Sequence, residues 1–336
     1  MPPTPDAPLH AALSARLHAL IDLGRALRDV GYRFVTVTPE THRRVLSRRP
    51  ARARNLRDVF GWSQPFDGDV VPVAMLDAMR AADVLRETKD GLASSVRFST
   101  LGDDLFVHSS YPTDDADAVF FGPDTYRFCA AISASNARGR RAIDIGCGSG
   151  AGGLSMRERV AELVLADVSA RALDHARVNA ALAGGAPSRG PSRGVEVVES
   201  DVLRGVEGSF DLIVANPPYM RDDLRDDLPD VRSENDRARV YRHGGGDFGE
   251  ALSVRIAAEG VERLARGGTM LLYTGAAIVD GDDTFLRAVS PIVARADVTM
   301  RYRELDPDVF GEELERPAYA AVERIAAVLL TLTRAP

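Results

Sequence analysis

Hydrophobic and polar positions follow a different pattern in the first third of this chain than in the rest of it. From about residue 113 onward, short apolar runs alternate with stretches of helical periodicity at 170–182 and 251–265. The apolar runs lie at 141–145, 163–166, 195–198, 211–215, 270–274 and 326–332. Runs of this length and composition are typical of buried strands, and their alternation with helices predicts an α/β fold with helices on both faces of a parallel sheet.

The first 112 residues instead predict a small helical domain with a β-hairpin. Leucine recurs at helical spacing from Leu9 to Leu27, which predicts a helix ending near Gly31. Further helices are expected at 53–60 and 73–87, and strands at 95–98 and 104–108 flank Gly102. Helices followed by a hairpin suggest a winged-helix arrangement. We therefore expect two domains, 1–112 for substrate recognition or as a lid and 113–336 for the chemistry.

Composition narrows the class of protein. The 336 residues are 45% hydrophobic, and no apolar run is long enough to cross a bilayer. The polar, Pro-rich N-terminus lacks the features of a secretory signal, so the cytoplasm is the expected location and no membrane contact is expected. Two cysteines and six scattered histidines have no metal-ligand spacing, and we predict no metal site.

Charge is distributed unevenly along the chain. Residues 1–112 carry 15 basic and 13 acidic side chains, whereas 113–336 carry 27 and 36. Seven arginines crowd into fifteen residues with no acid among them: Arg43, Arg44, Arg48, Arg49, Arg52, Arg54 and Arg57. This run could contact phosphate groups or form a solvated helix face. The lack of an aromatic platform within it favours the solvated face.

The first candidate site element is a glycine-rich turn, Asp144-Ile145-Gly146-Cys147-Gly148-Ser149-Gly150. Glycines at alternate positions after a buried strand let the backbone turn sharply and bring a ligand against main-chain amides. The spacing disfavours a pyrophosphate only mildly, because Ala151 would be tolerated at the third position of a dinucleotide-binding loop. It suits a nucleotide-like cofactor without phosphates, with the Asp144 charge close to the loop.

Acidic residues follow the next two strands. Asp167 ends the second strand, where a carboxylate can accept hydrogen bonds from both ribose hydroxyls. The alternative role for Asp167 is a helix N-cap, but Ser169 is better placed to cap the helix from residue 170. Asp201 follows the third strand and could bind an adenine amino group, with Val202 as an apolar neighbour for the ring.

Asn216-Pro217-Pro218-Tyr219 lies at the end of the apolar strand 211–215. Alone it could be a turn, because Asn and Pro often end strands. Its position after the glycine turn and the two acidic strand ends makes a polar pocket facing a bound cofactor the better interpretation.

With these motifs in this order, residues 140–275 resemble the class I S-adenosylmethionine-dependent methyltransferases, whose seven-stranded Rossmann-like sheet would account for the remaining strands. The tetrapeptide is similar to that of enzymes that methylate planar nitrogens: glutamine N5 methyltransferases of release factors, adenine-N6 DNA methyltransferases and guanine-N2 ribosomal RNA methyltransferases. Gly122-Pro123-Asp124-Thr125 and Gly244-Gly245-Gly246-Asp247 look most like the glutamine (HemK-like) branch.

The resemblance implies S-adenosyl-L-methionine as the cofactor and assigns roles to two sets of residues. Catalysis would fall to Asn216, Pro217 and Tyr219. Cofactor binding would fall to Asp144, Gly146, Cys147, Gly148, Gly150, Asp167, Val168, Asp201, Val202 and Asn216.

The tetrapeptide suits the chemistry of a planar nitrogen, whose lone pair is delocalised and must become more pyramidal to attack a sulfonium methyl. The Asn216 side-chain oxygen and the Pro217 carbonyl would each accept one N–H, and Tyr219 would stack on the flat substrate group. No metal or strong base is required.

The acceptor and the oligomeric state stay open. The highly charged stretch 221–248 could be a substrate lid or a solvated loop, and its acids disfavour a polyanion near the site. Three function classes remain: methylation of a protein side chain or small molecule, which we favour, methylation of a base in RNA or DNA, and another displacement on the sulfonium, such as cyclisation of the methionyl moiety.

Overall fold

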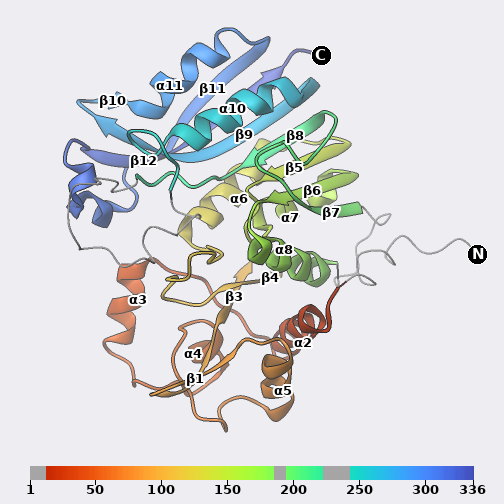
Figure 1. The fold of residues 1–336 in the computed structure, drawn as a ribbon, viewed down its shortest axis with the longest axis vertical. Helices are drawn as coiled ribbons and strands as arrows, with labels where there is room; N and C mark the ends of the chain where they lie inside the picture. The colour runs from red at the N-terminus through yellow and green to blue at the C-terminus, as the bar shows by residue number, and fades with distance from the viewer. Residues whose placement is uncertain (1–12, 185–193, 222–242) are drawn as a thin grey trace, which may run out of the picture.

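A mixed β-sheet forms the upper part of the molecule in Figure 1, which shows a computed structural model. The structure describes residues 13–184, 194–221 and 243–336. Seven strands have the order β11-β12-β9-β8-β5-β6-β7. Their bounds are β5 Arg141–Ile145, β6 Glu162–Asp167, β7 Gly194–Glu199, β8 Phe210–Ala215, β9 Leu264–Val279, β11 Val298–Asp306 and β12 Arg324–Arg334. A short β10 (Asp282–Asp283) also pairs with β9.

All six predicted strands are present in this sheet. Strands β5 to β9 pair in parallel, whereas β12 runs antiparallel to both β9 and β11. The predicted seven-stranded Rossmann-like sheet is confirmed. The seventh strand, β11, has exposed side chains at most positions and polar residues interspersed along it, so it lacks the apolar run by which the other strands are recognised.

Helices cover both faces of the sheet because side chains alternate along each strand. Along β5, Ala142 belongs to one core cluster and Ile143 and Ile145 to the other. The first cluster includes residues of α6 (Pro123–Ser135), α7 (Ala151–Ser155) and α8 (Ala170–Ala183). The second includes residues of α10 (Ala251–Arg263) and α11 (Thr284–Val293). Single-turn 3-10 helices lie at Arg157–Arg159, Gly311–Glu315 and Pro317–Tyr319.

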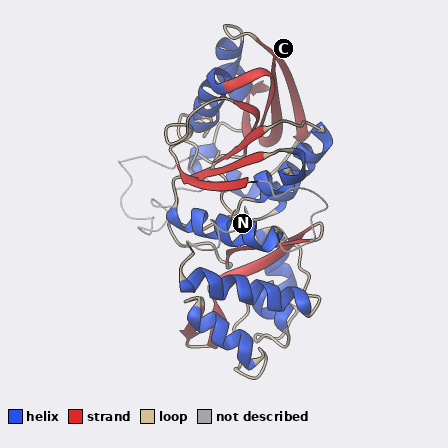
Figure 2. Cartoon of the chain, turned by 90° about the vertical axis from the view of Figure 1, so that its right-hand side faces the viewer, coloured by secondary structure: helices blue, strands red, loops and turns tan. Residues whose placement is uncertain are grey.

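The N-terminal region forms the lower part of Figures 1 and 2 and has a core of its own. Its helices are α2 (Ala15–Asp29), α3 (Pro39–Leu46), α4 (Leu56–Phe60) and α5 (Val73–Ala81). The predicted hairpin is confirmed as β3 (Val96–Leu101) and β4 (Asp104–Ser109). A second hairpin, β1 (Leu85–Thr88) with β2 (Gly91–Ser94), was not predicted. The winged-helix arrangement stays a prediction.

Two predicted helices in this region were partly wrong. The helix at 73–87 ends at Ala81, because Asp83 takes a positive φ of 54°, and residues 85–88 form a strand instead. The helix at 53–60 begins only at Leu56, where the Asn55 side chain accepts the N–H groups of Arg57 and Asp58. The start predicted for the first helix, at Leu9, lies outside the described residues.

Helix α8 joins the N-terminal region to the sheet. Three of its residues, Val178, Ala181 and Leu182, belong to the N-terminal core cluster. On the same helix the buried Asn179 donates to the carbonyls of Val107 (2.9 Å) and Ser149 (2.8 Å) and accepts the Val107 N–H (2.7 Å). The β3–β4 hairpin and the glycine turn are therefore both held against α8 by Asn179. The boundary at residue 112 stays a prediction.

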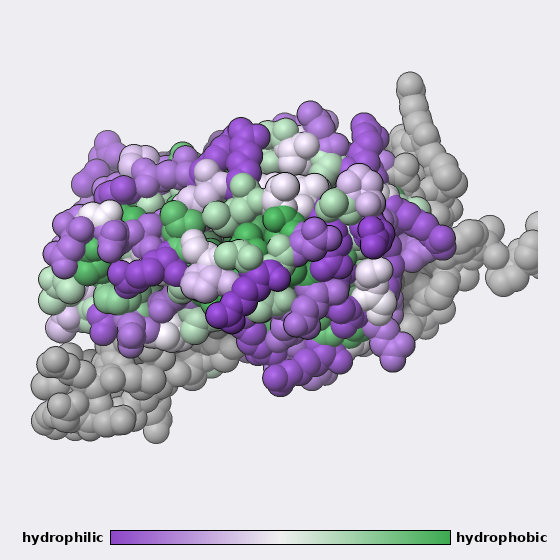
Figure 3. Space-filling view, turned by 90° about the horizontal axis from the view of Figure 1, so that it is seen from above, coloured by the Kyte–Doolittle hydropathy of each residue, from purple (hydrophilic) through white to green (hydrophobic). Residues whose placement is uncertain are grey.

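Strand β11 ends the sheet with one unpaired edge. Its exposed arginines, such as Arg301 and Arg303, discourage pairing with another strand. Seen from above in Figure 3, hydrophilic residues surround a central area of more hydrophobic ones.

Candidate active site

A cavity of about 490 Å³ lies at the carboxyl ends of β5, β6, β7 and β8. In a parallel sheet, residues that follow neighbouring strands meet at one edge, which is where ligands bind in open α/β folds. All the predicted site residues line this cavity, except Gly150. The structure thus brings together motifs that are up to 75 residues apart.

The glycine turn has the backbone that the sequence predicted. Gly146, Gly148 and Gly150 have positive φ angles of 65°, 53° and 78°. A Cβ would have open space at Gly146 and Gly148, so there the glycines are required by conformation alone. Gly150 precedes α7 and lies behind the turn, where a Cβ would be 3.2 Å from Leu165.

Asp144 lies beneath the turn and is only 1% exposed. Its carboxylate accepts the Gly153 N–H at 2.7 Å. Burial raises the pKa of Asp144 to about 7, since few groups compensate for its lost hydration. Any cation that enters the cavity beside Asp144 would therefore stabilise its ionised form.

Asp167 closes the turn from the neighbouring strand. One carboxylate oxygen accepts the Gly148 N–H at 2.9 Å, and the other accepts the Ser169 N–H at 2.9 Å. Burial raises the pKa of Asp167 despite these bonds. Ser169, as predicted, caps α8 through the Ala172 N–H. Next to it, Val168 is 51% exposed and lines the cavity, so a flat ligand group covering it would bury apolar surface.

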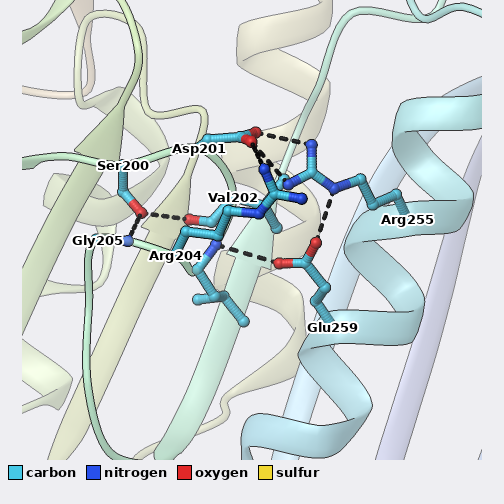
Figure 4. A network of polar contacts seen from close by, with 8 residues as sticks. Ser200, Asp201, Val202, Arg204, Gly205, Arg255 and Glu259 are labelled. Atoms are coloured by element: carbon cyan, nitrogen blue, oxygen red, sulfur yellow. Dashed lines mark hydrogen bonds and ion pairs between the residues drawn. The ribbon is translucent and has the colours of Figure 1, made fainter.

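Asp201 takes part in a network that the sequence did not suggest (Figure 4). Arg255, on α10, donates to both carboxylate oxygens, at 2.7 and 2.9 Å, and Arg204 donates to one of them at 2.9 Å. The Arg255 guanidinium lowers the pKa of Asp201. An adenine amino group would have to share this carboxylate with two guanidinium groups, which is possible because each oxygen has two lone pairs.

Asn216 is half-buried at the end of β8 and lines the cavity. Among the described residues, its side chain has no hydrogen-bond partner, so its amide group is available to a ligand. Beside it, Pro217 is buried and also lines the cavity.

Tyr219 is held from behind by a buried carboxylate. Its hydroxyl donates to Asp124 at the start of α6, and Asp124 also accepts Tyr273 O–H at 3.0 Å and Arg127 Nη1–H at 3.1 Å. Asp124 is 2% exposed, and burial raises its pKa. The Tyr219 ring packs edge-on to Phe310 at 6.2 Å. Sequence reasoning did not connect Asp124 with Tyr219, because 95 residues separate them.

A second glycine-rich segment packs against the tetrapeptide. The Gly244 N–H donates to the Met220 carbonyl at 3.0 Å, and a Cβ on Gly249 would be 2.2 Å from the Tyr219 carbonyl oxygen. Only glycine permits so close an approach. The charged stretch predicted as a lid or a solvated loop falls mostly on 222–242, outside the described residues.

The described parts of the chain contain no group of three or more His, Cys, Asp or Glu side chains arranged to hold a metal ion. None of their helices is long and apolar enough to span a membrane.

Comparison with known proteins finds similarity to methyltransferases over part of the chain. Residues 128–229 match the family model of the "Methyltransferase small domain". A release factor glutamine methyltransferase of Deinococcus radiodurans is 37% identical over 135 residues, 39% of this chain and 44% of that protein. A ribosomal RNA small subunit methyltransferase C of Haemophilus influenzae is 37% identical over 81 residues, 24% of this chain and 22% of that protein.

The matches span about half the length of these curated relatives or less. Among solved structures, WT Trm5b from Pyrococcus abyssi has a TM-score of 0.48 at 10% identity, over 90% of this chain and 79% of that one.

Proposed function

The chain contains a class I S-adenosylmethionine-dependent methyltransferase domain, and from this premise we propose that it transfers the cofactor's methyl group to the side-chain amide nitrogen of a glutamine in an acceptor protein. The observation that carries the proposal is the side-chain amide of Asn216, which lines the cavity beside Pro217 and has no hydrogen-bond partner among the described residues. Two relatives named release factor glutamine methyltransferase, 37% and 36% identical over 135 and 138 residues, support it.

The residues on the cavity wall fit S-adenosyl-L-methionine. Asp167 would bind the ribose hydroxyls, Val168 and Val202 would pack against the adenine ring, and Asp201 would accept its amino group. Asp144 lines the same cavity, where a positive charge would offset the cost of ionising its buried carboxylate. The cofactor, when bound, supplies an electrophilic methyl group on a positively charged sulfur.

In the proposed mechanism, the Asn216 Oδ1 and the Pro217 carbonyl accept the two N–H groups of the substrate amide. Each bond strengthens as the nitrogen loses its planarity and becomes more positive, so these acceptors stabilise the transition state more than the ground state. The methylated nitrogen would then lose one of its two protons to solvent, which leaves a neutral N-methyl amide. The rings of Pro217 and Pro218 fix their φ angles, which restricts the direction of the carbonyl groups in the tetrapeptide. Asp124 holds Tyr219 in place by accepting its hydroxyl hydrogen bond. Tyr219 would complete the wall against which the flat amide lies.

A base in RNA is the second candidate acceptor, since the Haemophilus influenzae relative is named for ribosomal RNA. A base amine has the same planar geometry as an amide, and the same two acceptors would serve it. The exposed arginines near α3 could contact its phosphates.

The acceptor is tested by incubating the protein with methyl-labelled cofactor and extract fractions, with and without protease and nuclease. We expect label that protease removes and nuclease does not, in a peptide whose mass spectrum localises the methyl group to a glutamine. Nuclease-sensitive label would favour the RNA base instead. Methylthioadenosine as the product in place of S-adenosylhomocysteine would refute methyl transfer.

A further inference from the structure

A second cavity, of about 740 Å³, adjoins the first. Pro39 and Glu312 line both cavities, so the two meet at these residues. The second cavity lies between α3 of the N-terminal region and Glu312, which precedes β12 in the methyltransferase part. A polypeptide whose glutamine enters the first cavity would place its neighbouring residues in the second.

One wall of this second cavity is aromatic. The His42 ring lies 4.3 Å from the Tyr111 ring and 5.3 Å from the Trp62 ring, measured between centroids. Both His42 and Trp62 are more than nine-tenths buried. Burial, together with the charge of Arg97, lowers the pKa of His42 to about 4, so the wall itself is uncharged at neutral pH.

A buried cation lies behind this wall. Arg97, on β3, is 4% exposed, and in the part of the chain that the structure describes its guanidinium has no ion pair or hydrogen bond. Its Nε and Nη2 atoms are buried without a partner. The ring of Phe34, 5.3 Å away, gives it a cation–π contact, and the Phe34 ring packs edge-on to Trp62, which lines the cavity, with the ring centroids 5.2 Å apart. The charge of Arg97 also contributes to the lowered pKa of His42, which lines the same cavity.

Such a cation is expensive to bury. Moving an unpaired charge out of water costs several kcal/mol, which a carboxylate normally offsets. Within a protein its field is weakly screened and reaches a neighbouring cavity more strongly than a surface charge does. The second cavity is therefore a place where a negative group would be stabilised without needing to touch Arg97.

We propose that the second cavity binds an acidic side chain of the acceptor protein, close in sequence to the glutamine that is methylated. This inference rests on the proposed function. Three charged side chains line this cavity, Glu40, Arg43 and Glu312, and Glu40 forms ion pairs with Arg43 and Arg44. A single carboxylate fits better than a phosphate chain, because a chain with a charge on every unit would also have to pass Glu312, where the two cavities meet.

The fluorescence of Trp62 can report binding in the second cavity, because Trp62 is the only tryptophan in the sequence and lines that cavity. Synthetic peptides with one glutamine, flanked by either glutamate or the uncharged methionine of similar size, are titrated in the presence of S-adenosylhomocysteine while Trp62 fluorescence is followed. We expect the glutamate peptide to bind at least about tenfold more tightly, a difference of about 1.4 kcal/mol. Equal affinities of the two peptides would overturn the proposal, as would tighter binding of a short RNA.

Three variants test the structural basis. Arg97→Met removes the charge and keeps an unbranched apolar chain as far as about the Nε position, and we expect it to abolish the preference for glutamate while thermal unfolding shows a folded protein. Ser47→Phe narrows the cavity from its rim and should weaken binding of the glutamate peptide, whereas Thr41→Phe, on α3 but off the cavity, should not. An unchanged preference in Arg97→Met would refute the role of the buried cation.

This binding measurement needs no methyl transfer, so the two proposals fail separately. If the glutamate preference is found but no glutamine is methylated, only the proposed function is wrong. If glutamine is methylated without any such preference, only the assignment of the second cavity is wrong.

Discussion

Replacing Asn216 by alanine separates chemistry from folding. The Asn216 side chain is half-buried and has no hydrogen-bond partner among the described residues, so its truncation leaves no protein group unpaired. The large losses of stability seen for point mutations come from cavities, broken networks or unpaired buried groups, and none of these arises here. We expect the free energy of unfolding to fall by about 1 kcal/mol or less.

The barrier to methyl transfer should rise much more. Two acceptors face the substrate nitrogen in the proposed mechanism, the Asn216 Oδ1 and the Pro217 carbonyl, and the variant removes one of them. Loss of one preorganised hydrogen-bonding group of this kind costs about 3 kcal/mol. At about 1.4 kcal/mol for each factor of ten, the rate of the chemical step should fall by roughly 100-fold or more.

The assay is single-turnover formation of S-adenosylhomocysteine with the identified acceptor, alongside calorimetry of cofactor binding. Asn216→Asp is the comparison variant, because it keeps an acceptor oxygen in the same position while the amide NH2 becomes a second, negatively charged acceptor oxygen. We expect Asn216→Asp to retain more activity than Asn216→Ala. Unchanged turnover in Asn216→Ala would refute the reasoning, and equal losses in both variants would show that an acceptor oxygen at this position is not sufficient.

Three further predictions concern the cofactor side and the glycine segment. Asp167→Ala should weaken cofactor binding by at least roughly 100-fold in calorimetry, because two bonds from ribose hydroxyls to a charged group, about 1.5–3 kcal/mol each, are lost. Normal binding would remove the ribose role. The pKa of Asp144 is raised from 3.8 to about 7, so the folded state holds a proton that the unfolded state has released, and stability should fall as pH rises through this window. Cofactor affinity should rise over the same range, because the positive sulfonium favours the ionised carboxylate, and Asp144→Asn should flatten both profiles in calorimetry and thermal unfolding. Gly249→Ala should reduce turnover far more than Gly281→Ala: both glycines have positive φ, 87° and 78°, but only at Gly249 does a Cβ collide with the Tyr219 backbone. Equal activity of these two variants, measured with folded protein, would show that the glycine segment does not position the tetrapeptide.

Much of the fold could be predicted from local patterns, and the exceptions have identifiable causes. Central strands such as β5 and β8 are apolar on both faces, so their residues alone reveal them. Strand β11, at the edge, has mostly exposed side chains and gives no such signal. The strand at Leu85–Thr88 was predicted as helix, because its apolar residue continued the periodicity of α5 and nothing local reveals the positive φ of Asp83.

The same division applies to the candidate site. The sequence by itself determined which residues would gather at the carboxyl edge of the sheet, because parallel strands place their ends together whatever the intervening loops do. It thereby pointed to the glycine turn, Asp167 and the tetrapeptide. Only the tertiary structure decided which side chains from other segments contact these residues. The Asp124 carboxylate that holds Tyr219 and the Arg255 fork on Asp201 come from distant segments, and their partners depend on side-chain packing that no local pattern encodes.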